Sequence, residues 1–111
     1  MGRGRSVTAR DRVVVAEDVQ LDPVKHELHV RGRGVHLRPR ESALLEILAG
    51  QPGRTFTRQE LLEQMGHPAD TEHARTIDVH VRWLRAKLQR EKAERVRLVT
   101  VRGFGYRLES R

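Results

Sequence analysis

The feature that most constrains the fold is an apolar stripe in the last third of the chain. Residues 74–90 carry apolar side chains at Ile77, Val81, Leu84 and Leu88, spaced by four, three and four positions. An α-helix turns by about 100° per residue, so these side chains gather on one side of it. The spacing predicts a long helix that buries one face and leaves its charged faces in solvent.

The N-terminal part of the chain has a different pattern. Short apolar segments follow one another there, and turn residues such as Asp22-Pro23 and Gly32-Arg33-Gly34 separate them. The segments cover residues 13–15, 19–21, 27–30 and 35–37. Such spacing is typical of antiparallel strands, so we expect a small four-stranded meander.

Helical spacing begins at Pro39. The apolar residues of this segment recur at positions 43, 44, 47 and 48, and Gly50 followed by Pro52-Gly53 ends it. The pattern predicts a first helix over residues 39–50. Its N-terminus lacks a side-chain cap, since the preceding Arg38 has no acceptor for the first amides.

A second helix is expected over residues 58–65. Thr57 and Glu60 form a capping box, in which each side chain accepts a hydrogen bond from the backbone N–H of the other residue. Residues 66–73 contain turn formers but no periodic apolar residues. We expect them to form a loop before the long helix.

The chain ends in a predicted β-hairpin, with strands at 96–100 and 106–108 and a tight tip that carries Arg102. Together the elements predict an α+β fold: a winged helix-turn-helix with an N-terminal four-stranded antiparallel sheet, three helices and a C-terminal β-hairpin wing. We expect residues 12–111 to form this domain. Residues 1–11, rich in Gly and Arg, are expected to be a disordered tail or a linker remnant.

Positive charge is concentrated in the same third of the chain as the long helix. Residues 75–107 hold ten Lys or Arg and three acidic residues, a balance of +7 that equals the formal net charge of the whole chain. The first 74 residues hold eleven basic and eleven acidic side chains. A neutral body with one basic end is typical of a polyanion binder, and nucleic acid is the commonest such partner.

The sequence disfavours several other classes of protein. No apolar run could span a bilayer and no signal-peptide pattern follows the basic start, so we expect no membrane partner. The absence of cysteine fits a cytoplasmic protein. We find no nucleophile with a base, no paired carboxylates on one face and no metal cluster, so we expect neither catalysis nor a cofactor.

Two short motifs have simple explanations. His26 and His29 have the spacing of metal ligands, but residues i and i+3 of a strand point to opposite faces, so no metal site is expected. Gly103-Phe104-Gly105 follows no βαβ unit and is expected to be a turn. An RNA-binding protein remains the alternative to a DNA-binding one. RNA-binding proteins often expose aromatic side chains on which bases stack, however, and only 4% of the residues in this chain are aromatic.

Three separated segments resemble one known family. They read TRQELL at 57–62, RTIDVHVRWLRAKL at 75–88 and TVRGFGYRL at 100–108. In this order, behind a four-stranded sheet, they are similar to the effector domain of bacterial OmpR/PhoB-type response regulators. The resemblance covers about residues 13–108. It implies a transcription factor domain that places its third helix in the major groove of DNA and its wing in the adjacent minor groove.

The resemblance also implies partners. In this family a receiver domain usually controls dimerisation on tandem half-sites of double-stranded DNA, as part of a two-component system. We expect either an excised effector domain or a stand-alone relative. In the family the segment corresponding to 66–73 can contact RNA polymerase, here through Asp70, Glu72 and His73, and an ordinary solvated connector is the alternative.

Side-chain chemistry and the resemblance together name the candidate contacts. The candidate readers of base edges in the major groove are Asp78, Val79, Arg82, Trp83 and Arg85. Donors stand at positions that the family uses for phosphate contact: Arg75, Thr76, His80, Thr100 and Tyr106. At the wing tip, Arg102 can enter the minor groove and Gly103 lets the backbone turn.

Some of these residues have alternative roles. Asp78 can instead orient a neighbouring Arg through a salt bridge, and Tyr106 can belong partly to the core. Trp83 can contact DNA, pack beside the wing or lie in the core. The chain also departs from the family pattern: Trp83 replaces a commonly basic residue, Arg38 replaces a capping Thr, and a Trp that often follows the second helix is missing.

Overall fold

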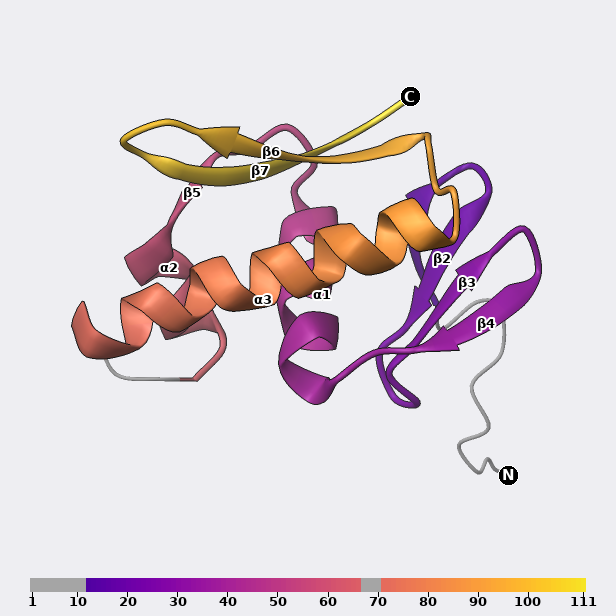
Figure 1. Cartoon of the computed structure of the whole chain (residues 1–111), viewed down its shortest axis with the longest axis horizontal. Coiled ribbons are helices and arrows are strands. Elements are labelled where there is room, and N and C mark those ends of the chain that lie inside the picture. The colour runs from indigo at the N-terminus through magenta and orange to yellow at the C-terminus, as the bar shows by residue number, and fades with distance from the viewer. Residues whose placement is uncertain (1–11, 67–70) are drawn as a thin grey trace.

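The computed structural model describes residues 12–66 and 71–111, with side chains from residue 76 onward in the second range. In chain order the elements are β1 (Val13–Ala16), β2 (Val19–Asp22), β3 (Glu27–Val30), β4 (Arg33–His36), α1 (Pro39–Gly50), β5 (Phe56–Thr57), α2 (Arg58–Gln64), α3 (Thr71–Arg90), β6 (Val96–Val101) and β7 (Gly105–Ser110) (Figure 1). This order confirms the predicted fold class. The tail expected at 1–11 lies outside the described residues.

The N-terminal strands form the predicted antiparallel sheet, in the order β1-β2-β3-β4. Its register pairs Leu21 with Leu28 and Val19 with Val30, and all four side chains are buried. Helix α1 packs against β1 and β2. The meander is therefore confirmed, although β4 covers Arg33–His36 rather than the predicted 35–37.

Glu41 supplies a cap for α1 that the sequence analysis missed. Arg38 offers no acceptor, as expected, but the Glu41 carboxylate accepts the Arg38 backbone N–H at 2.8 Å. The carboxylate is fully buried and also accepts a hydrogen bond from Lys87 Nζ of α3 at 2.7 Å. Burial alone would raise the pKa of Glu41, but the bonds from Lys87 and Arg38 lower it below its ordinary value. A buried ion pair thus ties the start of α1 to α3.

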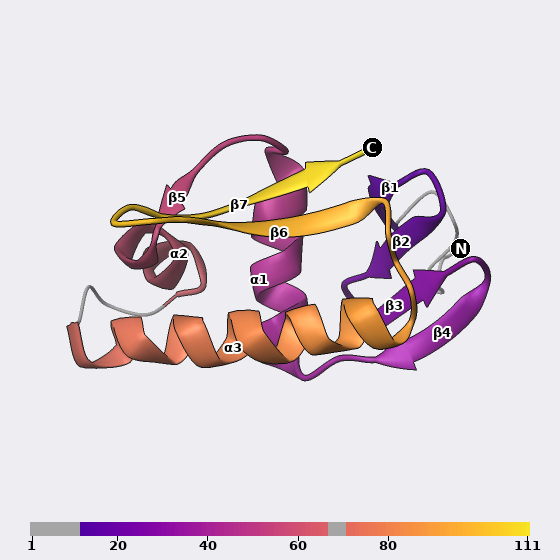
Figure 2. The ribbon, with the colours of Figure 1, turned by 45° about the horizontal axis from the view of Figure 1, so that its top comes forward.

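The C-terminal hairpin belongs to a three-stranded sheet in the order β5-β7-β6. Strand β5, only two residues long, was not expected, because two residues show no periodicity. Gly105 lies opposite Thr57 where β7 pairs with β5. A Cβ at Gly105 would overlap the Phe56 carbonyl oxygen, so only glycine permits this approach of the two backbones. Figure 2 shows the hairpin running along α3, with β5 and α2 near its tip.

Helix α3 begins at Thr71, earlier than predicted. The expected loop at 66–73 is therefore wrong for its last three residues, and residues 67–70 lie outside the described part. Apolar periodicity is the signal by which a helix is predicted, and the sequence has no apolar residue at 71–73. The predicted stripe is confirmed, since its four side chains are at most 5% exposed.

The core lies where the three helices meet the two sheets. Its largest buried side chains come from every layer and include Leu21, Leu44, Phe56, Ile77 and Leu108. None of the described helices has the length and apolar character that crossing a bilayer would require.

Candidate nucleic-acid interface

The outward face of α3 is exposed along its middle. The side chain of Val79 is 40% exposed and that of Trp83 is 38% exposed. Arg82 and Ala86 of the same face are also exposed. Within residues 12–66 and 71–111, no hydrogen bond or ion pair holds the Arg82 guanidinium. The predicted inward and outward faces of this helix are confirmed, and Arg82 is available to a ligand.

Asp78 pairs with groups on two other elements. Its Oδ1 accepts a hydrogen bond from Arg58 Nε of α2 at 2.7 Å and another from the Tyr106 hydroxyl of β7. Burial alone would raise the pKa of Asp78, but the bonds from Tyr106 and Arg58 lower it below its ordinary value. Of the two roles expected for Asp78, the structure shows the salt bridge. Its partner Arg58 was not singled out from the sequence, because no local pattern joins residues 20 positions apart.

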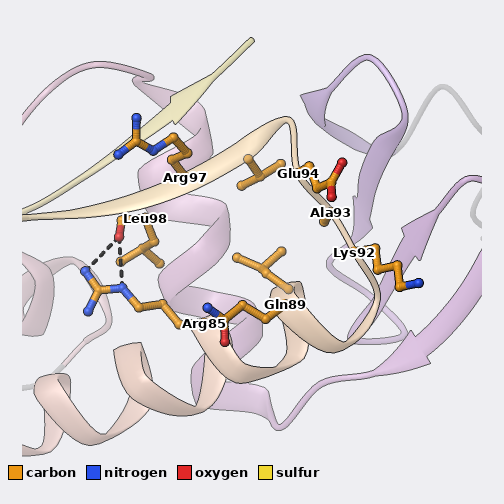
Figure 3. A pocket seen from close by; sticks show the side chains of 9 residues that line it. Arg85, Gln89, Lys92, Ala93, Glu94, Arg97 and Leu98 are labelled. Carbon is orange, nitrogen blue, oxygen red and sulfur yellow. Dashed lines mark hydrogen bonds between the residues drawn. The ribbon is translucent and has the colours of Figure 1, made fainter.

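Arg85 joins α3 to the wing, the hairpin of β6 and β7. Its Nε and Nη2 donate to the Leu98 carbonyl oxygen at 2.9 and 2.7 Å (Figure 3), and Nη2 also donates to Thr100 Oγ1 at 2.6 Å. A predicted base reader and a predicted phosphate ligand therefore bind each other. Base reading by Arg85 would require these bonds to break.

Next to Arg85, α3 and β6 enclose a groove of about 370 Å³ (Figure 3). Its lining combines apolar Leu88 and Val96 with polar Gln89 and Glu94. Arg85 is the one predicted contact residue among its lining residues. We assign the groove no part in the interface.

Two residues predicted to contact phosphate are buried. His80 is 9% and Tyr106 5% exposed, and the Tyr106 hydroxyl is already bonded to Asp78. Burial lowers the pKa of His80, and the nearby charges of Arg40 and Arg38 lower it further, which favours the neutral imidazole. His80 and Tyr106 therefore keep little exposed surface, and their contacts with phosphate stay predictions. A resemblance in sequence assigns roles to positions, but the burial of a side chain depends on how the elements pack.

The remaining predicted phosphate ligands stay predictions. Thr100 is exposed on β6, and its hydroxyl accepts the bond from Arg85. Thr76 is half-buried on α3 and already has an interaction partner. The side chain of Arg75 lies outside the described part of the chain.

The wing tip is the tight turn expected from the sequence. The Phe104 N–H donates to the Val101 carbonyl oxygen at 2.9 Å, and Gly103 has a φ of +76°, which favours glycine. Arg102 is exposed on this turn. Phe104 is 62% exposed beside it, an apolar group that the sequence analysis did not single out for contact.

Trp83 lies beside the start of α1. The Arg38 Cζ is 4.3 Å from the centroid of the Trp83 ring, and the His80 ring meets that ring edge-on at a centroid distance of 5.5 Å. The core alternative for Trp83 is wrong, since the side chain is 38% exposed, and packing beside the wing and DNA contact stay predictions. Arg38 was missed as its partner because it lies on another element, 45 positions earlier in the sequence.

Asp22, Glu27 and His29 hold ligand atoms within 4.8 Å of one another. Asp22 Oδ1 accepts two backbone N–H groups of the turn after β2, and His29 Nε2 lies 3.2 Å from Glu27 Oε1. His26 lies in that turn, before the first residue of β3, so the strand argument does not apply to it. The Asp22 carboxylate is thus engaged by the backbone of the turn, and the expected absence of a metal site stays a prediction.

Comparison with known proteins decides the family. Residues 32–108 match the family described as "Transcriptional regulatory protein, C terminal". The chain belongs to this family. The resemblance to OmpR/PhoB-type effector domains is thereby confirmed.

Relatives of this transcriptional regulatory domain include two named regulators. It is 40% identical over 101 residues to the sensory transduction protein RegX3 of Mycolicibacterium smegmatis, covering 91% of this chain and 44% of that protein. It is 46% identical over 94 residues to the phosphate regulon transcriptional regulatory protein PhoB of Rhizobium meliloti, covering 84% and 40%. The domain thus spans less than half the length of these relatives.

A solved structure supports the same assignment. The RstA DNA-binding domain of Klebsiella pneumoniae, in complex with the RstA box, matches the regulatory domain with a TM-score of 0.74 at 28% identity. The match covers 88% of this chain and 96% of that one. The winged-helix fold is therefore shared over nearly the whole of both.

Proposed function

We propose that this domain binds double-stranded DNA in a sequence-specific manner, as the DNA-binding part of a bacterial OmpR/PhoB-type transcription regulator. Helix α3 enters the major groove, and the wing reaches the adjacent minor groove. The observation that carries the proposal is the outward face of α3, where the unpaired Arg82 lies among the exposed Val79 and Trp83. The B-DNA major groove is wide enough to admit such a helix.

Arg82 and Val79 are the main base readers in this proposal. The guanidinium fork can donate to guanine O6 and N7, and the valine methyls can contact a thymine methyl. Trp83 offers an apolar surface to sugars and base edges. We assign Asp78 and Arg85 to positioning, because their hydrogen bonds hold α2, β6 and β7 against α3.

The wing and the flanks of α3 supply the backbone contacts. Arg102 enters the minor groove, where the negative potential of a narrow groove attracts a guanidinium. Arg75, Thr76 and Thr100 contact phosphates and set the register of the complex without reading sequence. The concentration of the net charge of +7 within residues 75–107 supports this division.

The wider assembly belongs to the same proposal. We propose a cytoplasmic output domain of a two-component system that binds tandem half-sites as a dimer and offers residues 66–73 to RNA polymerase. The support is the family and the names of the regulators to which the chain is similar. We propose neither a catalytic activity nor a cofactor for this domain.

Affinity for duplex DNA is expected to fall steeply with salt. Each phosphate neutralised by a Lys or Arg contributes about −0.9 to the slope of log affinity against log salt concentration. The measurement is fluorescence anisotropy on a duplex selected from random sequences, with RNA and single-stranded DNA as competitors. A slope near zero, or stronger competition by RNA than by duplex, would contradict DNA binding.

Arg82→Ala is expected to change DNA binding and sequence preference, whereas Asp78→Asn is expected to change the stability of the domain. Losing the Arg82 fork should cost roughly 1 to 3 kcal/mol of binding and relax preference at one or two base pairs. Asp78→Asn should lower the stability of the domain, through the weakened Arg58 and Tyr106 bonds, and leave the preferred sequence unchanged. Repeating the selection with both variants measures this. An altered preference in Asp78→Asn would restore Asp78 as a base reader.

A further inference from the structure

Arg38 and Trp83 form a stacked pair on the surface of the domain. The Arg38 Cζ lies 4.3 Å from the centre of the indole ring, a distance at which a guanidinium is attracted to the face of a Trp. Both residues are exposed. Arg38 precedes α1, and Trp83 lies on the outward face of α3. The contact therefore places the positive charge of Arg38 beside the outward face of α3.

The pair lies on the flank of α3 that faces away from the wing. At about 100° per residue, Trp83 and Arg85 are roughly 160° apart around the helix, and Arg85 holds the wing strand β6. Figure 2 shows α3 passing the N-terminal end of α1, with the hairpin on its other side. A helix in the major groove has a phosphate backbone on each side, so the flank at Arg38 faces one of these backbones.

Two contacts hold the Arg38 guanidinium and leave donors free. Nη1 lies 3.3 Å from Glu41 Oε2, and Cζ lies over the Trp83 ring. The side chain is 55% exposed. A guanidinium has five N–H donors, and the hydrogen bond to Glu41 uses one on Nη1. Glu41 is itself anchored by Lys87, which gives this arrangement a rigid base.

We propose that Arg38 is a phosphate-binding residue of the DNA interface and that Trp83 is the platform that positions it. The inference rests on the proposed DNA binding. The family commonly has a basic residue at the position of Trp83, so this chain lacks that positive charge on α3. Arg38, which contacts the Trp83 ring, supplies a positive charge at the same part of the surface. Because the guanidinium is already ordered, binding a phosphate costs little side-chain entropy.

The free protein provides the first test. Trp83 is the only tryptophan, so intrinsic fluorescence reports on this pair alone. Arg38→Ala is expected to raise the acrylamide quenching constant, since the guanidinium covers one face of the ring. Arg40→Ala is the matched control: it removes the same charge two positions away and should leave quenching unchanged.

Binding to the selected duplex provides the second test. Arg38→Ala should lower affinity roughly tenfold and reduce the salt slope by about 0.9, the value for one phosphate contact. In a Trp83→Leu background the same change should cost less than about threefold, because the guanidinium is no longer held in place. Equal losses in both backgrounds, an unchanged slope, or a loss no larger than that of Arg40→Ala would overturn the proposal. If the wild-type chain itself shows no salt-dependent duplex binding, the proposed function fails instead.

Discussion

Gly105→Ala is expected to destabilise the domain by about 3 kcal/mol or more, the range of severe steric substitutions. A Cβ at this position would overlap the Phe56 carbonyl oxygen and lie 2.8 Å from the Phe56 carbonyl carbon and 2.9 Å from Thr57 Cα. All three atoms belong to the backbone of β5, which cannot move aside as a flexible side chain can. The wing would lose its pairing with β5.

Urea denaturation measures this loss, and Gly50→Ala is the control. Gly50 ends α1, and a Cβ there would meet nothing within 4 Å. Alanine in a helix is favoured over glycine by up to about 1 kcal/mol, so the control should be neutral or stabilising. A Gly105→Ala variant with the wild-type free energy of unfolding would mean that β5 and β7 do not approach as described.

Lys87→Met is expected to cost about 3 kcal/mol at pH 7, because it leaves the fully buried Glu41 carboxylate without its closest cation. The folded-state pKa of Glu41 is lowered, so the pair contributes stability above the ordinary value of 4.5 and loses it as pH falls through the lowered folded value. Without Lys87, burial favours the protonated acid. The deficit of the variant should therefore shrink in acid.

The free energy of unfolding at pH 7 and pH 4 tests this ion pair. Arg90→Met removes one cation from an exposed position of the same helix and should change stability by no more than about 0.5 kcal/mol. A Lys87→Met deficit that is the same at both pH values would indicate lost packing of the lysine stem rather than an unpaired carboxylate.

Elements with a sustained period could be predicted from the sequence. The stripe at Ile77, Val81, Leu84 and Leu88 specified both the existence of α3 and its buried face, because burial on one side of a helix imposes that spacing. Strand β5 could not be predicted, since it exists only through its pairing with β7. The start of α3 at residues 71–73 was missed for a related reason: no apolar residue marks it in the sequence.

Only those features of the candidate site that depend on a single helix could be predicted from the sequence. The angle around α3 correctly put Val79 and Arg82 outward. It could not disclose that Asp78 bonds Arg58 on α2, or that Arg38 rests on Trp83, because these partners come from elements far away in the sequence. Such contacts depend on how the helices pack.

The bond from Arg85 to the Leu98 carbonyl has a consequence for selectivity. It fastens the hairpin to the helix, so the offset between the two elements is set before either meets a target. Under the proposed mode of binding, the duplex must supply the matching geometry by bending or by changing its groove width. The energy of that deformation depends on base steps that no side chain touches. The hydrogen bonds between Arg85 and Leu98 would thus make affinity depend on the stiffness of the DNA.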